Sequence, residues 1–440
     1  MKYRLTTLLL VVAFVQLNAQ SYRFNFAEGK HRSGFGADIV EKMYTRVTPN
    51  DVYTPERGYG FEFSRELIAA PDCITSSKPF YFSVKLREGN YHVIVAVGSF
   101  SGPSTTTIKV ECRRLMVEKV EIEKGIKSVE FTVHVRDSLI RTASDSSKVR
   151  LKPRERDYLH WDDKLTIEFS NTAPKIFSLE ITRVYNIPTI FLAGNSTVVD
   201  QANEPWAAWG QMIPNFFQPG RVAVANYAES GETLKAFRAE KRLEKIWSMS
   251  KPGDYLFIEF AHNDQKAGSS HLDPFTTYKE TLKEWINEAR SRKITPVLVT
   301  SMNRRTFDST GHITNSLGDY PEAVRQTGKE EGVAVIDLNA MSKTLYEALG
   351  PQPSIKAFVH FAANTYPNQP NDVKDNTHFS PYGAYELAKC VVNGIKENIP
   401  ALSKYLKKDL PKFDPAKPDD PEKWSLPASS FVGMVKPDGN

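Results

Sequence analysis

The sequence has little cysteine, and it has no long apolar run beyond its N-terminus. Three cysteines in 440 residues, Cys73, Cys112 and Cys390, are too few and too scattered for a disulfide scaffold or a zinc site. Cys73 and Cys112 can pair only if their strands are neighbours. Cys390 lies in a helical pattern, where we expect a small buried apolar residue. No later stretch approaches the roughly 18 apolar residues of a transmembrane helix, so we expect no membrane insertion.

The chain also lacks a large excess of positive or negative charge. The net charge is +5, from 57 basic and 52 acidic residues that are interspersed along the chain. Nucleic-acid binding normally requires a basic stripe, and because none is visible we expect no nucleic-acid partner. The mild positive balance is compatible with an acidic ligand without identifying one. The hydrophobic share of 40% and the charged share of 25% are ordinary for a globular protein that is long enough for two domains.

The N-terminus has the pattern of a secretory signal. Lys2 and Arg4 precede an apolar stretch over residues 8–17 that is too short to span a bilayer. We expect cleavage after Ala19, although Leu17 is larger than the residue usual at that position. No cysteine follows the expected cleavage site to carry a lipid. We therefore predict a signal peptide over residues 1–19 and an exported, unanchored protein, either periplasmic or secreted.

The hydrophobic pattern divides the rest of the chain into two parts. From residue 22 to about 185 apolar residues alternate with period two between turns, as in "YHVIVAVG" and "KLTIEFS". Strands of this kind without intervening amphipathic helices predict an all-β sandwich domain over residues 20–186. The second part, residues 187–402, alternates short apolar strands such as "TIFLAG" with helices of ten or more residues. Strands that are apolar on both faces predict an α/β domain, a parallel sheet wrapped in helices.

The last residues, 403–440, are rich in Lys, Asp and Pro. We expect them to form an extended tail on the surface, with Trp424 and Phe431 as anchors.

Polar residues follow the buried strands of the second part. They occur in "GNST" with Ser196, "AESGET" with Gly231, "AHND" with Asn263, and "DNTH" with Asp375 and His378. In an open parallel sheet, functional groups gather at the carboxyl ends of the strands. A hydroxyl nucleophile needs a base, and the base needs an acceptor that fixes its tautomer. We expect Asp375 and His378 to supply both from one short loop at a helix entrance.

Each of these residues also has an ordinary structural interpretation. Ser196, Asn263 and Asp375 suit helix N-caps, Gly231 suits a turn, and His378 suits a buried, hydrogen-bonded imidazole. Their co-occurrence at successive strand ends favours the joint interpretation. A Gly-x-Ser-x-Gly elbow, a Walker loop and a His-Glu-x-x-His motif are all missing from the sequence.

The four blocks, in this order, resemble the SGNH (GDSL-like) hydrolase family. "FLAGNST", "FIEFAHNDQ", "GDYPEAVRQ" and "DNTHFSPYGA" resemble the rhamnogalacturonan acetylesterases within it, over residues 188–400. The resemblance implies a flavodoxin-like α/β/α sandwich that removes acetyl groups from the rhamnogalacturonan backbone of pectin without a cofactor or metal ion. It also implies that Ser196 is the nucleophile, His378 the base and Asp375 its orienting acid. The backbone amides of Ser196 and Gly231 and the side-chain amide of Asn263 would form the oxyanion hole.

The sequence departs from the family pattern at two positions. Asn195 stands where an aspartate is usual, and Ala261 stands where a glycine is usual. Neither change removes a catalytic atom, but Asn195 loses a charge and Ala261 adds a methyl group in a tight place. In the first part, "YTPERGYGFEF" resembles a galactose-binding-like domain, which we expect to brace the hydrolase or extend its cleft.

The sequence indicates the substrate less directly than the chemistry. Arg304 and Arg305, just past the fourth strand of the α/β part, suit bidentate contact with galacturonate carboxylates, and a solvated surface pair is the alternative. We also consider His262 a substrate-binding candidate, although a structural role suits it too. Three other functions stay open: an esterase for another acetylated polysaccharide, a lipase-like or thioesterase-like hydrolase, and a non-catalytic carbohydrate-binding protein.

Overall fold

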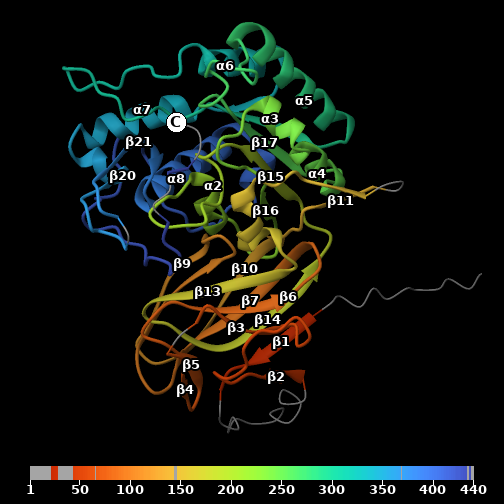
Figure 1. The fold of residues 1–440 in the computed structure, drawn as a ribbon, viewed down its shortest axis with the longest axis vertical. Coiled ribbons are helices and arrows are strands. Elements are labelled where there is room, and N and C mark those ends of the chain that lie inside the picture. The colour runs from red at the N-terminus through yellow and green to blue at the C-terminus, as the bar shows by residue number, and fades with distance from the viewer. Residues whose placement is uncertain are drawn as a thin grey trace, which may run out of the picture.

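A computed structural model describes residues 21–27, 43–64, 66–142, 146–367, 369–433 and 436–437. The predicted signal peptide, residues 1–19, lies outside these residues. In Figure 1 a β-rich part, red to yellow, lies below an α/β part, green to blue. Within the described residues, no helix combines the length and the apolar character needed to cross a membrane.

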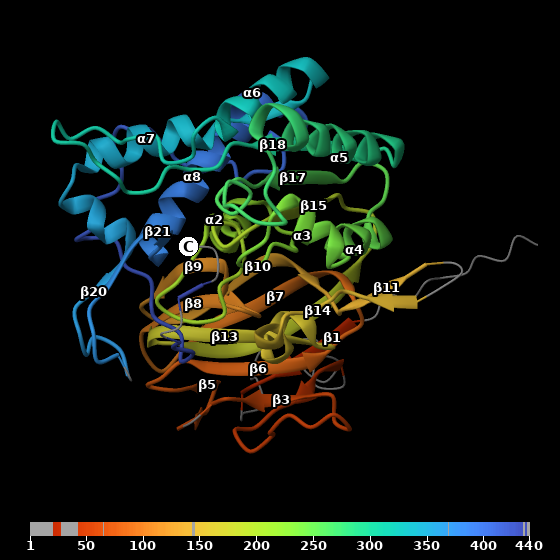
Figure 2. The ribbon, with the colours of Figure 1, turned by 45° about the horizontal axis from the view of Figure 1, so that its top comes forward.

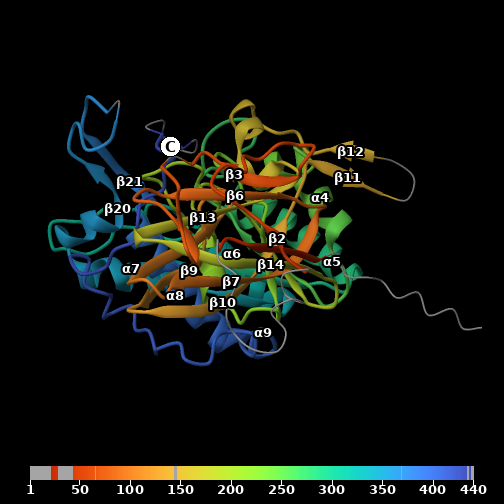
Figure 3. The same ribbon diagram turned by 90° about the horizontal axis from the view of Figure 1, so that it is seen from below.

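Two sheets form the β-rich part. The first has the order β10 (Gly125–Val135), β7 (Gly89–Ser99), β14 (Lys175–Val184), β1 (Ser21–Asn25) and β2 (Thr45–Arg46), with β5 (Cys73–Thr75) pairing β14 and β4 (Ile68–Ala70) pairing β5. The second has the order β3 (Tyr59–Glu62), β6 (Phe80–Lys85), β13 (Lys164–Ala173), β8 (Ser104–Val110) and β9 (Arg114–Ile122). All pairs are antiparallel except β1 with β2. In Figure 3 the two sheets are seen as two layers, with β6 and β13 above and β7 and β10 below.

Period-two burial explains why this part folds as paired sheets. Along β7, Tyr91, Val93 and Val95 are fully buried, and they share one core with Phe82 and Ile167 of the opposite sheet. Alternation therefore places one face of each sheet in a common interior, as the sequence predicts for a sandwich. All three cysteines are free and buried, so Cys73 and Cys112 do not form a disulfide.

A short segment between the two long strands β10 and β13 leaves the sandwich. It contains the hairpin of β11 (Leu139–Arg141) with β12 (Ser146–Lys148), then two 3-10 turns, η1 (Pro153–Asp157) and η2 (Leu159–Trp161). These turns contact the α/β part, as described below.

The α/β part is built on a parallel sheet of five strands. Their order is β16 (Ala223–Asn226), β15 (Thr189–Gly194), β17 (Tyr255–Glu259), β18 (Thr295–Val299) and β19 (Ala334–Ile336). Every residue of β15 and β17 is buried, which explains why these strands show no alternation.

Helices cover both faces of this sheet. One face packs against α2 (Trp209–Met212), α7 (Leu338–Leu349) and α8 (Pro381–Asn398). The other face packs against α3 (Leu234–Ala239), α4 (Arg242–Met249), α5 (Lys279–Ser291) and α6 (Tyr320–Glu331). The expectation of ten or more residues in each helix is wrong for α2, α3 and α4, which have four, six and eight. A 3-10 turn, η3 (Ile213–Phe216), follows α2 directly, and Pro214 within it stops the helix from continuing.

The chain ends with a hairpin, a helix and a tail. The hairpin pairs β20 (Phe358–Phe361) with β21 (Val373–Phe379) just before α8, and α9 (Pro400–Ser403) follows α8. In its described residues the tail beyond α9 has no helix. Trp424 packs on Tyr385, and Phe431 packs edge-on against Tyr81 of the β-rich part. Figure 2 shows this dark-blue segment descending toward β13, where Ser429 hydrogen-bonds to Glu168.

Candidate active site

Three of the predicted residues form one chain of hydrogen bonds. The Ser196 Oγ atom lies 2.9 Å from His378 Nε2, and His378 Nδ1 lies 2.8 Å from Asp375 Oδ2. If the imidazole carries its proton on Nδ1 and donates it to the carboxylate, Nε2 is left to accept from the serine hydroxyl. Fold contacts bring Ser196 and His378 together across 182 residues of sequence. The arrangement is able to transfer the serine proton to the imidazole.

Asp375 is held as a carboxylate. Burial would raise its pKa, but the hydrogen bond and charge of His378 outweigh burial, together with the backbone amides of His378 and Thr377. These amides donate to Oδ1 over 3.0 and 2.7 Å, and the resulting pKa is about 2. The acid therefore stays charged at neutral pH, which fixes the Nδ1 proton of the imidazole.

The turn after β15 presents Ser196. Asn195 Oδ1 accepts hydrogen bonds from the Thr197 backbone and hydroxyl at 3.1 and 2.8 Å, which closes a tight turn around the serine. A Cβ at Gly194 would lie 2.5 Å from a methyl carbon of Val198, so only glycine fits the end of this strand. Asn195 thus keeps the acceptor role of the usual aspartate, but its buried Nδ2 has no hydrogen-bond partner among the described residues.

One expectation about local structure is wrong. Asp375 and His378 belong to strand β21 rather than to a loop at the helix entrance. Asp375 pairs with Val359 of β20, and the ladder shifts register beside Phe358. The two hydrogen bonds that Asp375 accepts from Thr377 and His378 curl the end of the strand, and this brings the carboxylate beneath the imidazole.

The predicted oxyanion-hole groups lie in two loops beside the serine turn. Gly231 has a φ of 83°, a left-handed conformation that favours glycine. Within the described chain, the backbone amides of Ser196 and Gly231 donate to no other residue. Asn263 Nδ2 donates to the Glu232 carbonyl over 3.0 Å, which ties the asparagine loop to the Gly231 loop. Ala261 has a φ of 157°, at the edge of the same region, which accounts for the glycine usual there.

Basic residues of the β-rich part hold the Gly231 loop. Lys152 Nζ donates to the Ser230 carbonyl over 2.6 Å and pairs with Glu232 Oε1 at 2.5 Å. Arg154, in η1, donates to the same carbonyl over 2.8 Å and to Glu229 over 2.7 Å. Residues that lie nearly eighty positions earlier in the chain therefore clamp both sides of Gly231.

We call these contacts around Gly231 the clamp. They bury carboxyl groups that are not all charged near neutral pH. Burial, as the largest cause, raises the pKa of Glu229 to about 7 and that of Glu232 to about 8. Arg242, fully buried, lies closest to Glu155 of η1, with contacts of 2.5 and 3.1 Å. Near neutral pH, protons on these glutamates reduce the number of charges buried behind the loop.

Strand β9 and the residue before it support the other side of the serine turn. Arg114 donates to Asp200 Oδ2 over 2.6 and 2.9 Å, and both side chains are buried. Arg113 donates to the Trp206 carbonyl over 2.8 Å. The Trp206 ring in turn meets the His378 imidazole edge-on, with centroids 5.8 Å apart. The β-rich part thus contacts residues on both sides of Ser196.

Two of the three predicted substrate-binding residues, Arg304 and Arg305, contact β21, and Arg304 also contacts the third, His262. His262 is buried, and burial lowers its pKa well below the usual range, so the ring is neutral. Arg304 donates to the Ser316 carbonyl at 3.0 Å and approaches the His262 carbonyl at 3.4 Å. Arg305 donates to Ser354 Oγ over 3.1 Å. Protein oxygens occupy these guanidinium groups, and their binding of substrate stays a prediction.

A model of the GDSL-like lipase/acylhydrolase family matches residues 192–384. Rhamnogalacturonan acetylesterase RhgT of Bacillus subtilis (strain 168) is 45% identical over 210 residues, which are 47% of this chain and 89% of that enzyme. The chain belongs to the GDSL-like lipase/acylhydrolase family. It is a serine ester hydrolase, as predicted.

A second relative extends over more of the chain. The uncharacterized esterase YxiM of B. subtilis (strain 168) is 25% identical over 379 residues, 82% of this chain and 89% of that protein. The crystal structure of YxiM has 22% identity and a TM-score of 0.44, and the match covers 86% of this chain and 98% of that one.

A pocket of about 470 Å³ opens beside the triad of this GDSL-like hydrolase. We call it the junction pocket, because the β-rich part, the α/β part and the tail all line it. Its walls include Arg154, Tyr158, Asn203, Trp206, Phe431 and Lys436. Gln201, also in its wall, donates to the Ser196 carbonyl over 2.9 Å, and Lys436 Nζ lies 3.5 Å from Asp375 Oδ2.

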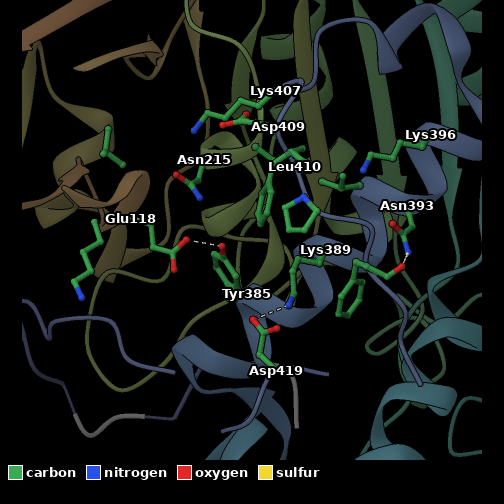
Figure 4. A pocket seen from close by; sticks show the side chains of 16 residues that line it. Glu118, Asn215, Tyr385, Lys389, Asn393, Lys396, Lys407, Asp409, Leu410 and Asp419 are labelled. Atoms are coloured by element: carbon green, nitrogen blue, oxygen red, sulfur yellow. Dashed lines mark hydrogen bonds and ion pairs between the residues drawn. The ribbon is translucent and has the colours of Figure 1, made fainter. Parts of the chain in front are cut away.

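A second pocket, of about 440 Å³, lies between β9, α8 and the tail (Figure 4). It contains none of the predicted site residues. Glu118 there accepts a hydrogen bond from the Tyr385 hydroxyl, and Lys389 pairs with Asp419 at 2.8 Å. Across the described residues, no cluster of three or more His, Cys, Asp or Glu side chains is arranged to hold a metal ion.

Proposed function

We propose that this enzyme removes acetyl groups from the rhamnogalacturonan backbone of pectin through an acetyl-enzyme on Ser196. The hydrogen-bonded chain of Ser196, His378 and Asp375 is the observation that supports this chemistry. The relative that is 45% identical and is named a rhamnogalacturonan acetylesterase supports the proposed substrate.

In the first half of the reaction, Ser196 Oγ attacks the acetyl carbonyl while His378 Nε2 takes the hydroxyl proton. The carbonyl oxygen becomes an oxyanion, which the amides of Ser196 and Gly231 and the Asn263 side chain stabilise. The bond to the sugar oxygen then breaks, and His378 returns its proton to that oxygen. The products are the free sugar hydroxyl and an acetyl ester on Ser196.

The second half repeats these steps with water. His378 removes a proton from a water molecule, whose oxygen attacks the acetyl-enzyme through a second oxyanion. Ser196 leaves and recovers the proton from His378, and acetate departs. Asp375, with its pKa of about 2, stays a carboxylate throughout and stabilises the imidazolium that forms in each half.

We also propose the domain boundaries that the sequence predicts. Residues 20–186 form a galactose-binding-like β-sandwich domain, residues 187–402 the catalytic domain and residues 403–440 a tail, after a signal peptide that directs export. The sheet order, in which the first strand of the α/β part lies between the second and third, supports a flavodoxin-like catalytic domain.

Acetate release from acetylated rhamnogalacturonan, compared with acetylated xylan at equal acetyl content, tests the substrate. We expect kcat/KM to be at least tenfold higher on rhamnogalacturonan. A preference for xylan would reject the substrate but not the chemistry. Failure to hydrolyse either polymer or a small aryl acetate would reject both.

A further inference from the structure

We propose that the junction pocket is a subsite that binds a uronic acid of the acetylated glycan, close to the reacting acetyl group. The inference rests on the proposed function, because it places the glycan chain relative to Ser196. It concerns a site beyond the triad and the oxyanion hole.

The position of the pocket supports this assignment. Gln201 in its wall contacts the Ser196 carbonyl, Trp206 packs on the His378 ring, and Lys436 reaches Asp375. A sugar in the pocket would therefore lie on the same side of the molecule as the triad, next to residues that contact it. Its volume of about 470 Å³ is within the range of pockets that hold small organic ligands.

Most lining residues of this pocket lie outside residues 192–384, the part of the chain that the family model matches. Tyr158 and Arg154 come from the β-rich part, and Phe431 and Lys436 come from the tail. The relative with 45% identity matches over 89% of its own length but only 47% of this chain, so it lacks a counterpart for most of the remainder. These walls therefore add contacts that the family fold alone does not supply.

The polar and aromatic groups of the pocket suit a sugar ring. Tyr158 is half-buried, and its ring is held edge-on by His160, with centroids 5.6 Å apart. Neither the Tyr158 hydroxyl nor the Asn203 amide is hydrogen-bonded to another residue in the described part of the chain. An aromatic face packs against the C–H face of a sugar, while uncommitted hydroxyl and amide groups bind its hydroxyls.

Two cations favour an acidic sugar. Lys436 contacts Asp375 and Arg154 contacts Glu229, but Lys436 is about half exposed and Arg154 about a third exposed, so part of each cation still faces the solvent at the pocket. Asp157 is the acid in the pocket wall, and its side chain is exposed at the rim. A carboxylate near Lys436 gains a charge-assisted contact that a neutral sugar does not gain.

Binding to the inactive Ser196→Ala variant tests the pocket without requiring turnover. The probe is an unacetylated oligosaccharide of alternating rhamnose and galacturonic acid, measured by titration calorimetry. We expect the further change Tyr158→Ala to weaken binding at least tenfold, and Tyr185→Ala, an exposed tyrosine at the end of β14, to leave it unchanged. Equal affinity in both variants overturns the assignment. If Tyr158→Ala unfolds in a thermal melt, Asn203→Ala replaces it, with at least fivefold weaker binding expected.

The acidic preference has its own test in the same background. Lys436→Gln should weaken binding of the acidic oligosaccharide about tenfold and leave its carboxyl-reduced form unaffected. Lys423→Gln, an exposed lysine in the same tail, is the matched control and should change neither. Equal losses on both forms, or no loss on either, overturn the uronic-acid assignment.

Separate outcomes distinguish a wrong subsite from a wrong substrate. If the active enzyme hydrolyses aryl acetate but releases nothing from acetylated rhamnogalacturonan, the proposed substrate is wrong. The binding measurements then still decide whether the pocket holds a uronic-acid sugar. If acetate is released but the Tyr158 and Asn203 variants bind normally, the subsite alone is wrong.

Discussion

Lys152 provides a sharp test of whether the β-rich part contributes to catalysis. The change Lys152→Met keeps an unbranched side chain but removes the 2.6 Å hydrogen bond to the Ser230 carbonyl and the contact with Glu232. The lysine is four-fifths buried, so water does not readily replace it. We expect the Gly231 loop to loosen.

The structure sets the size of both effects. A hydrogen bond to a charged group contributes about 1.5–3 kcal/mol, so the free energy of unfolding should fall by about that amount. A larger loss is not expected, because Glu232 has a pKa of about 8 and is mostly neutral at pH 7. Loss of an oxyanion donor lowers kcat by a factor of about 10²–10³. Partial displacement of Gly231 should lower kcat by a smaller factor, about 10 to 100.

The assay is steady-state hydrolysis of a small aryl acetate at pH 7, with denaturant unfolding measured alongside. We expect kcat to fall while KM changes less than threefold, and Lys152→Arg to recover part of kcat by restoring the donor. Lys148→Met, an exposed lysine on β12, is the control. If Lys152→Met loses stability but keeps kcat within twofold of the parent, the clamp is only structural and our reasoning is refuted.

Two further predictions concern the same loops. Asn263→Ala should lower kcat on aryl acetate by about 10²–10³ with little change in KM, because it removes a donor aimed at the oxyanion, and a loss below threefold would exclude that role. Glu232 binds its proton more tightly when folded, with a pKa of about 8 against 4.5, so its contribution to stability falls as pH rises from about 4.5 to 8. Denaturant unfolding should accordingly show a shallower loss of stability between pH 5 and 8 in Glu232→Gln, and an identical slope in both proteins would contradict the raised pKa.

The fold was predictable where burial leaves a simple pattern. β15 and β17 are apolar on both faces, and apolar residues alternate along β7. Each pattern therefore shows whether both faces of the strand are buried or only one. β8 was not predicted, because its sequence "STTTIKV" has buried threonines and no clear alternation. The length of α2 was mispredicted although the sequence carries the signal, because Pro214 follows the helix and stops it. The close packing of α2 on the serine turn was not predictable, since only the folded chain shows that a Cβ at Gly210 would lie 2.1 Å from the Val198 carbonyl oxygen.

The triad was predictable, but its support was not. Ser196, Asp375 and His378 carry reactive groups beside buried strands, and strand ends of a parallel sheet meet at one edge. Lys152 and Arg154 lie in "LKPRERDY", a charged stretch that has the composition of a solvated loop. Only the folded chain shows that this stretch is packed against Gly231, because no local pattern indicates a contact with residues nearly eighty positions away.

Turnover of Ser196→Ala tests the central claim most directly. Without the hydroxyl that lies 2.9 Å from His378, no acetyl-enzyme can form, and kcat on aryl acetate should fall by about 10⁶ while the thermal melt is unchanged. A folded variant that keeps a tenth or more of the parent activity would show that the acetyl group is transferred without this serine.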